Sequence, residues 1–149
     1  MSNNKTVENL NKALQMEISA SHQYQLHAHV LDDWGLDRLA AKMREEQAEE
    51  AGHSDLFIER ILFLNGLPNF QAIHKLKVGE TVEEILKADL AMEMEAIPLL
   101  KEAAEYCQSV RDFATGQIFE DILASEEEHV DFLETQFDMI ARMGLENYV

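Results

Sequence analysis

The sequence predicts an all-α fold, a four-helix bundle with a long crossover between the second and third helices. Three features of the 149-residue chain support this. Aromatic residues make up 7% of the chain, while Ala, Leu, Glu, Met and Gln are abundant, a composition that favours helix over strand. Apolar residues recur at alternating intervals of three and four in four long stretches, as in amphipathic helices. Two of the links between these stretches are short and one is long. We therefore expect two helical hairpins in a single domain spanning residues 1–149, followed by a short C-terminal tail or fifth helix.

The first two helices are expected to form an antiparallel hairpin. Thr6 can cap the first helix with its side chain, and the Asp-Trp-Gly sequence at 33–35 ends it, because glycine accepts the left-handed conformation found at helix C-termini. The second helix runs from about Leu36 to Leu64, after a link of only a few residues. So short a link brings two helices side by side in opposite directions.

The link between the second and third helices, residues 66–81, has no helical period and carries Pro68 and Gly79. Its 16 residues can reach roughly 50 Å when extended, whereas the preceding helix is about 43 Å long. The link can therefore run the full height of a bundle. Such a crossover makes the second and third helices parallel.

The boundaries of the second hairpin follow from its capping residues. Thr81 and Glu84 form a capping box that starts the third helix, and residues 109–112 make a short turn before the fourth. The fourth helix extends to Gly144, which ends it. Residues 145–149 then form the tail or a partial fifth helix.

The net charge of −17 restricts the classes of partner. Such a surface repels nucleic acid and anionic membranes and attracts cations, and no apolar stretch is long enough to span a membrane. The single cysteine, Cys107, cannot form an internal disulfide, which fits a reducing compartment. The first five residues lack the apolar core of a signal peptide. We therefore expect a cytoplasmic protein that binds neither nucleic acid nor membrane.

Each expected helix places a glutamate in the middle of its apolar seam, and the four are Glu17, Glu50, Glu93 and Glu126. An interval of 33 positions separates the first two, and the same interval separates the last two. A histidine follows the second glutamate of each pair by three positions, as His53 and His129. Residues three apart share one face of a helix, and residues equally far from a hairpin turn lie at the same height. All six side chains should therefore meet in one layer of the bundle.

Four carboxylates buried together cannot all stay ionised without compensation. Two divalent cations would balance their charges. Oxygen ligands with imidazole suit iron or manganese, and the absence of thiolates disfavours a structural zinc site. The alternative is a metal-free structural bundle, in which the helical phase is misassigned and the six residues lie on the surface.

Around these residues the chain resembles the bacterioferritin family over nearly its whole length. The resemblance rests on the motifs at Gln23 to His27, Asp33 to Leu36, Glu59 to Pro68, Asp89 to Ala91, Glu126 to His129 and Met143 to Tyr148. It implies a hollow 24-mer shell of four-helix subunits. Each subunit would oxidise Fe(II) with O2 or H2O2 at a non-haem di-iron ferroxidase centre, and the shell would store the ferric product as mineral.

The resemblance also implies a role for each residue of the layer. Glu17 and His53 would serve one iron, Glu93 and His129 the other, and Glu50 and Glu126 would bridge them. Three more residues are weaker candidates. Tyr24, on the seam of Glu17, could hydrogen-bond a ligand carboxylate or simply be a core tyrosine. Glu45 and Glu49, beside the seam of Glu50, could bind iron on the inner surface of a shell or form a solvated charged face.

One residue departs from the family pattern. Haem-binding members carry a methionine directly after the bridging glutamate of the second helix, and two subunits each donate one across a two-fold axis. This chain has Ala51 there, which offers no ligand atom. We therefore expect no haem b in a homo-oligomer, while co-assembly with a haem-binding subunit is left open.

Two alternatives to an iron-storage ferroxidase stay open at this point. One is a non-storage iron or manganese peroxidase or oxidase on the same bundle, although a rubrerythrin-like protein would need a Cys-x-x-Cys module that this chain lacks. The other is the metal-free structural bundle. The remaining histidines, at positions 22, 27, 29 and 74, have no partner at ligand spacing and are expected to be surface or interface residues.

Overall fold

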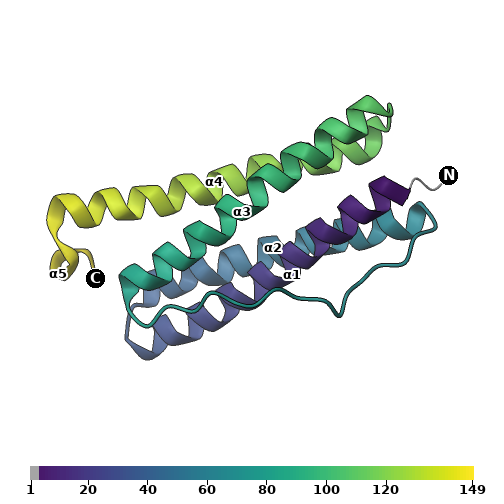
Figure 1. The fold of residues 1–149 in the computed structure, drawn as a ribbon. Coiled ribbons are helices and arrows are strands. Elements are labelled where there is room, and N and C mark those ends of the chain that lie inside the picture. Colours follow the sequence, from purple (N-terminus) through teal and green to yellow (C-terminus); the bar gives the residue numbers. More distant parts are fainter. Residues whose placement is uncertain (1–3) are drawn as a thin grey trace.

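A computed structural model describes residues 4–149 and confirms the all-α fold. The helices are α1 (Asn4–Asp33), α2 (Asp37–Phe63), α3 (Val82–Ser109), α4 (Phe113–Met143) and the short α5 (Leu145–Tyr148). Figure 1 shows two long hairpins, α1 with α2 and α3 with α4, stacked into a bundle. No helix within residues 4–149 combines the length and apolar character needed to cross a membrane. The expectation about a signal peptide falls partly on residues 1–3, outside the described part of the chain.

The N-terminus of α1 differs from the prediction. Thr6 does not cap the helix, because the helix already includes Asn4 and Thr6 is buried on its inner side. The other end agrees with the prediction. Gly35 has a φ of 79°, and the Leu36 N–H donates to the Leu31 carbonyl at 2.9 Å, as in a Schellman motif.

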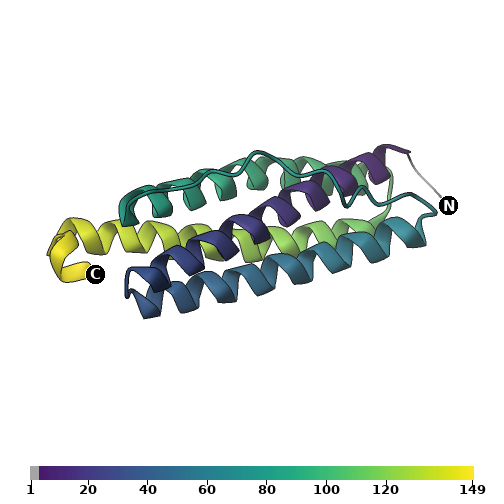
Figure 2. The same ribbon diagram turned by 90° about the horizontal axis from the view of Figure 1, so that it is seen from below.

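The crossover runs the full length of the bundle, as its length predicted, and α2 and α3 point the same way (Figures 1 and 2). It lies along α1, whose side chains hydrogen-bond to the crossover backbone at residues 67, 69, 74, 77 and 79. At its end, the Thr81 side chain accepts a hydrogen bond from the Glu84 N–H at 3.2 Å. The Glu84 carboxylate accepts one from the Glu80 N–H rather than from Thr81, so the capping box is displaced by one residue.

The core consists of two separate apolar clusters. One lies toward the α3–α4 turn and contains Leu10, Leu14, Phe57, Ile61, Leu100 and Phe119. The other lies toward the α1–α2 turn and contains Ala28, Leu31, Met43, Leu86 and Leu133. Between them lies the layer of buried glutamates. The fold therefore holds a polar layer in the middle of the bundle, with an apolar cluster on either side.

The buried face of α3 is rotated slightly from the predicted seam. The three-and-four spacing through Glu93 would place Leu90 and Ile97 on this face, but both are only half-buried. Asp89 and Ala96, their neighbours, are buried instead. Leu86, Glu93 and Leu100 are buried as the pattern predicts, so the rotation is less than one residue, yet it brings the Asp89 carboxylate into the interior.

Candidate metal centre

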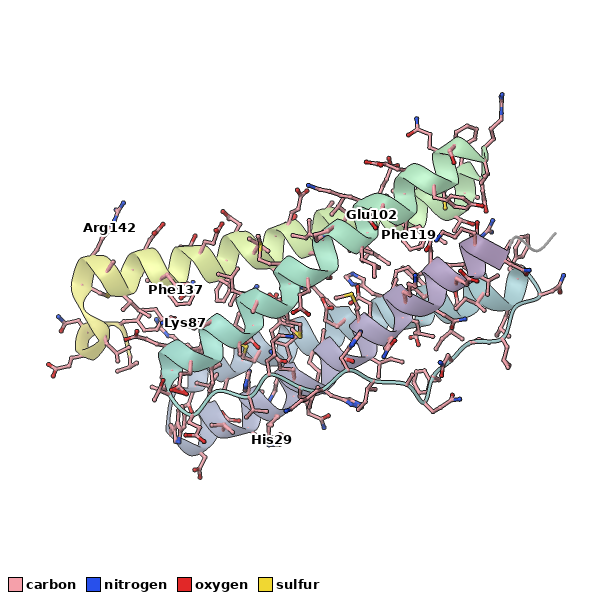
Figure 3. The ribbon with its side chains drawn as sticks, viewed as in Figure 1. His29, Lys87, Glu102, Phe119, Phe137 and Arg142 are labelled. Carbon is pink, nitrogen blue, oxygen red and sulfur yellow. The ribbon has the colours of Figure 1, made fainter. Side chains whose placement is uncertain are left out.

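The structure brings together all six residues that the sequence placed in one layer. Glu17, Glu50, Glu93 and Glu126 are each no more than 2% exposed, and His129 is 3% exposed. His53 is the least enclosed, with a side chain 13% exposed. Each of the four long helices contributes from its middle, where the two hairpins face each other. Figure 3 shows side chains of all four helices filling this space.

The six residues form two overlapping groups of candidate ligands. Glu17, Glu50, His53 and Glu126 make one, and Glu50, Glu93, Glu126 and His129 make the other. Within each group, one ligand atom per residue lies within 4.8 Å of all the others. Glu50 and Glu126 belong to both groups. The geometry is that of two adjacent cation positions with two shared carboxylates.

The two imidazoles face the carboxylates in matching ways. His53 Nδ1 lies 3.2 Å from Glu126 Oε1 and 3.6 Å from Glu17 Oε2. His129 Nδ1 lies 3.2 Å from Glu50 Oε1 and 3.5 Å from Glu93 Oε1. Yet both Nδ1 atoms, and one oxygen of each of the four glutamates, are buried without a well-formed hydrogen bond. Unpaired buried atoms of this kind are costly, and two divalent cations would satisfy them, so the residues fit a di-metal centre.

Burial and neighbouring charges shift the pKa values of the side chains in the layer. Burial raises the pKa of Glu50 well above its usual value, and the carboxylates of Glu17 and Glu126 add to the effect. Burial and Glu126 do the same to the pKa of Glu93. Burial lowers the pKa of His53, but Glu126 and Glu17 outweigh it and raise that pKa to about 10. Protons therefore balance charges that divalent cations can balance instead.

His129 is surrounded by carboxylates on both edges of its ring. Its Nε2 lies 2.6 Å from Glu49 Oε2 and also contacts Glu46 Oε2. Burial opposes its charged form, but Glu46 and Glu93 outweigh this and raise its pKa to about 12. Because Nε2 donates to a carboxylate, Nδ1 is the nitrogen left to face the shared glutamates.

Glu45 and Glu49, the two glutamates predicted to lie beside the seam, have different surroundings in the structure. Glu49 contacts His129, whereas the Glu45 side chain is 65% exposed and lies 3.9 Å from Lys42 Nζ. Sequence reasoning gave no role to Glu46, which is buried and 3.0 Å from Lys42 Nζ. Its position on the seam, four residues before Glu50, was the signal that could have found it.

Tyr24 lies beside the layer, where its seam spacing predicted. Its buried hydroxyl donates to Glu93 Oε1 at 2.8 Å. Burial, reinforced by Glu93, raises the pKa of Tyr24 well above its usual value. The hydroxyl therefore keeps its proton and remains a donor to this carboxylate.

The expectation that His27 is a surface or interface residue is wrong. His27 is fully buried, and its Nδ1 lies 2.9 Å from Oδ1 of the equally buried Asp89. The pairing was missed because the predicted seam of α3 passes through Leu90, whereas the structure buries its neighbour Asp89. The other three histidines, His22, His29 and His74, are exposed as expected, and His29 points away from the bundle in Figure 3.

Ala51 is exposed on α2, away from the buried layer. It follows the shared ligand Glu50 directly, yet its side chain is on the outside of the subunit. A ligand bound at this position would therefore lie outside the bundle and not between the four helices.

The sequence is similar to known proteins over almost its whole length. Residues 7–143 match the profile of the Ferritin family, a ferritin-like domain. The bacterioferritin of Brucella melitensis biotype 1 is 47% identical over 144 residues, which cover 97% of this chain and 89% of that protein. That of Rhodobacter capsulatus is 46% identical with the same coverage. That of Streptomyces coelicolor is 41% identical over 143 residues, covering 96% of this chain and 86% of that protein.

Proposed function

The chain belongs to the ferritin-like family and, within it, to the bacterioferritins, and from this premise we propose that it stores and detoxifies iron. It is a ferroxidase that oxidises Fe(II) at a di-iron centre inside the four-helix subunit and deposits the ferric product as mineral in a protein shell. One observation carries this function: Glu50 and Glu126 belong to both groups of buried ligands. Two shared carboxylates would hold two Fe(II) ions side by side, so that both could give an electron to one oxidant molecule.

The roles of the residues follow from the two groups. Glu17 and His53 would hold one iron, Glu93 and His129 would hold the other, and Glu50 and Glu126 would serve both. The distances of 3.2–3.8 Å from each Nδ1 to its neighbouring carboxylates support this division. Glu46 and Glu49 hold the far side of the His129 ring and aim its Nδ1 inward.

The chemistry needs a two-electron acceptor. Two bound Fe(II) ions supply two electrons, enough to reduce O2 to H2O2 or H2O2 to two waters, with two protons taken up. The protein's own residues bind the Fe(II) ions and orient the carboxylates and imidazoles that hold them. Tyr24 fixes Glu93 by donating to it, the apolar clusters keep bulk water from both sides of the layer, and the net charge of −17 attracts Fe(II).

The assembly is part of the same proposal. Residues 1–149 form one domain, and twenty-four copies form the shell, alone or together with a haem-binding subunit. Because Ala51 has no atom that can ligate iron, a shell of this chain alone holds no haem b by paired methionine ligation. A stoichiometric Soret band in the purified homo-oligomer would contradict this. The protein acts in the cytoplasm, which its single cysteine fits.

Anaerobic titration with Fe(II), followed by addition of O2 or H2O2, tests the function. We expect two Fe(II) per chain, a diferric absorption band on oxidation, and mineral when iron is in excess. Absence of binding would establish the metal-free bundle instead. Turnover of peroxide without mineral would establish a non-storage oxidase, and size-exclusion chromatography with light scattering would separate a shell from a monomer.

A further inference from the structure

One face of α1 carries a row of polar side chains that bind the crossover. Asn11, Ser19, Gln23 and His27 lie four or eight positions apart, so they share a face of the helix. They bind crossover backbone groups in the same order: Asn11 at residues 67 and 69, Ser19 at 74, Gln23 at 77 and His27 at 79. Figures 1 and 2 show the crossover running the length of the bundle, across α1 and on to the start of α3. The last two members of the row also reach α3.

Gln23 and His27 both donate to a single oxygen of Asp89 on α3. Gln23 Nε2 lies 2.8 Å and His27 Nδ1 lies 2.9 Å from Asp89 Oδ1. The Gly79 N–H donates to His27 Nε2 at 3.2 Å, so Nε2 carries no proton and Nδ1 is the donor to Asp89. These hydrogen bonds assign a neutral imidazole held in one tautomer by two fixed partners.

The three-residue network made by Gln23, His27 and Asp89 lies directly beside the metal centre. Asp89 is one helical turn before Glu93 on α3, and Tyr24, the donor to Glu93, lies between Gln23 and His27 on α1. Three side chains of α1 therefore donate hydrogen bonds to two carboxylates of α3, Asp89 and Glu93, which lie one helical turn apart. Such a ladder fixes both the distance and the axial register between the two helices.

That register matters because α1 and α3 supply ligands to different metal positions. Glu17 on α1 belongs only to the first group of ligands, and Glu93 on α3 belongs only to the second. A slide of one helix along the other would move these two carboxylates apart. Three hydrogen bonds to fixed acceptors resist such a slide more specifically than apolar packing does.

Stability alone does not explain the network. Asp89 is fully buried and its Oδ2 has no hydrogen-bond partner. Replacing a buried, incompletely satisfied polar network by apolar side chains is often neutral or stabilising. A costly arrangement next to a metal centre indicates positioning.

We infer that Gln23, His27 and Asp89 are positioning residues that set the spacing between the two halves of the di-iron centre, an inference that rests on the proposed function. None of the three belongs to either ligand group, and they act through the register of α1 against α3. The same network holds the end of the crossover. Gly79 has no room for a side chain, because a Cβ there would lie 2.3 Å from the backbone nitrogen of Ile85.

Anaerobic Co(II) titration, followed by visible absorption, tests this inference without relying on oxidation. In the assembled protein, Asp89→Leu is expected to weaken one of the two binding steps by about 10- to 100-fold, the usual effect of losing an outer partner of a metal ligand. Asp89→Asn keeps an acceptor oxygen for both donors and should restore binding. Gln23→Met removes one donor at nearly constant volume and should give a smaller loss of several-fold.

Two further variants separate positioning from general loosening. Ser19→Ala removes a crossover hydrogen bond at residue 74 but touches nothing on α3, so both binding steps should stay unchanged. His27→Asn can still donate from the place of Nδ1 but cannot reach Gly79. Hydrogen exchange should then be faster at the Gly79 amide while Co(II) binding is retained.

The outcomes distinguish this inference from the proposed function. If the unaltered protein fails to bind two Co(II) per chain, the di-iron centre itself is wrong. If it binds two and both Asp89→Leu and Gln23→Met bind them equally well, the positioning role is wrong. Should Asp89→Leu fail to fold, Gln23→Met decides the question, and unchanged binding there overturns the inference.

Discussion

The two halves of the metal centre have the same ligands but different surroundings. In the half from α1 and α2, the side chains of Glu17 and His53 pair with other members of the six-residue layer. Within residues 4–149, neither side chain forms a hydrogen bond to any residue outside this layer. The half from α3 and α4 is supported on both sides, because Tyr24 donates to Glu93 and the carboxylates of Glu46 and Glu49 hold His129. Its histidine is also more deeply buried.

This difference shows that a sequence repeat does not make two sites equivalent. The interval of 33 positions places the same residue types at the same height in each hairpin. The neighbours then differ, since Glu46 and Glu49 of α2 contact only one of the two histidines, His129. We expect the α3–α4 position to be preorganised and the α1–α2 position to be adaptable.

The largest effect is expected when both halves are disabled together. Glu50→Gln combined with Glu126→Gln removes the shared carboxylates, so neither position keeps a full ligand set. Rapid Fe(II) oxidation should be abolished while the helix content by circular dichroism stays the same. Stopped-flow absorption measures the rate, and an unchanged rate would mean that the centre lies in another layer.

Removing one histidine at a time tests whether the halves differ. His129 holds its proton more tightly than His53, with a pKa of about 12 against about 10, so protons compete more strongly with a cation at His129. We expect this competition from protons to outweigh the preorganisation of the α3–α4 position, so that the first Co(II) occupies the α1–α2 position. His129→Ala should keep the first binding step and lose the second, whereas His53→Ala should weaken the first. The reverse order would refute this assignment.

The pH dependence of metal binding follows from the same pKa shifts. The pKa values of Glu50, Glu93, His53 and His129 are all raised, so the metal-free layer retains protons that cations must displace. Affinity should rise with pH from 6 to 8 and fall on acidification, by about tenfold per pH unit for each proton released. Titration in weakly buffered solution should show at least two protons released per pair of Co(II). Binding without proton release would contradict the charge balance described above.

Changing Glu46 should bring the pKa of His129 closer to the pKa of His53. Glu46→Gln keeps a hydrogen-bond acceptor near His129 Nε2 but removes a negative charge that raises the pKa of His129. The pKa of His129 in the metal-free protein should fall toward that of His53, as measured by NMR titration. Glu45→Gln is the matched control, because Glu45 is exposed and makes no contact with His129. An equal shift in both variants would indicate a general charge effect.

The smallest effect is expected from Tyr24→Phe, which removes only the hydroxyl that donates to Glu93. A lost hydrogen bond to a charged group is worth about 1.5 kcal/mol, so the α3–α4 position should bind Co(II) roughly tenfold more weakly. The first binding step should not change. Tyr148→Phe, which loses a hydrogen bond to Gln136 far from the layer, is the control and should leave both steps unchanged.

The six ligands of the layer could be predicted from the sequence, but the residues that hydrogen-bond around them could not, for a physical reason. Helical periodicity and the two short turns place Glu17, Glu50, Glu93 and Glu126 at one height, because each lies near the middle of a long amphipathic stretch. Neighbouring residues on a helix point about 100° apart, so a seam that passes through Leu90 misses the buried Asp89 and therefore the partner of His27.

The supports of His129 were missed for a second reason. Three neighbouring glutamates on α2, Glu45, Glu46 and Glu49, have similar chemistry in the sequence, and only the packing of α4 decides which of them face the imidazole. Contacts between helices from different hairpins are not encoded in the period of either helix. For the same reason the cap expected at Thr6 failed, since only packing shows that the helix starts earlier and buries this residue.

The two apolar clusters at the ends of the bundle also bear on how such a protein can change over generations. Neither cluster includes a ligand of the polar layer, so apolar packing is concentrated at the ends and the candidate chemistry in the middle. Substitutions in the middle layer can then be sampled without losing the fold. When packing and chemistry lie in different parts of a bundle, we expect that a few substitutions in the middle layer can change the bound metal or the reaction during evolution.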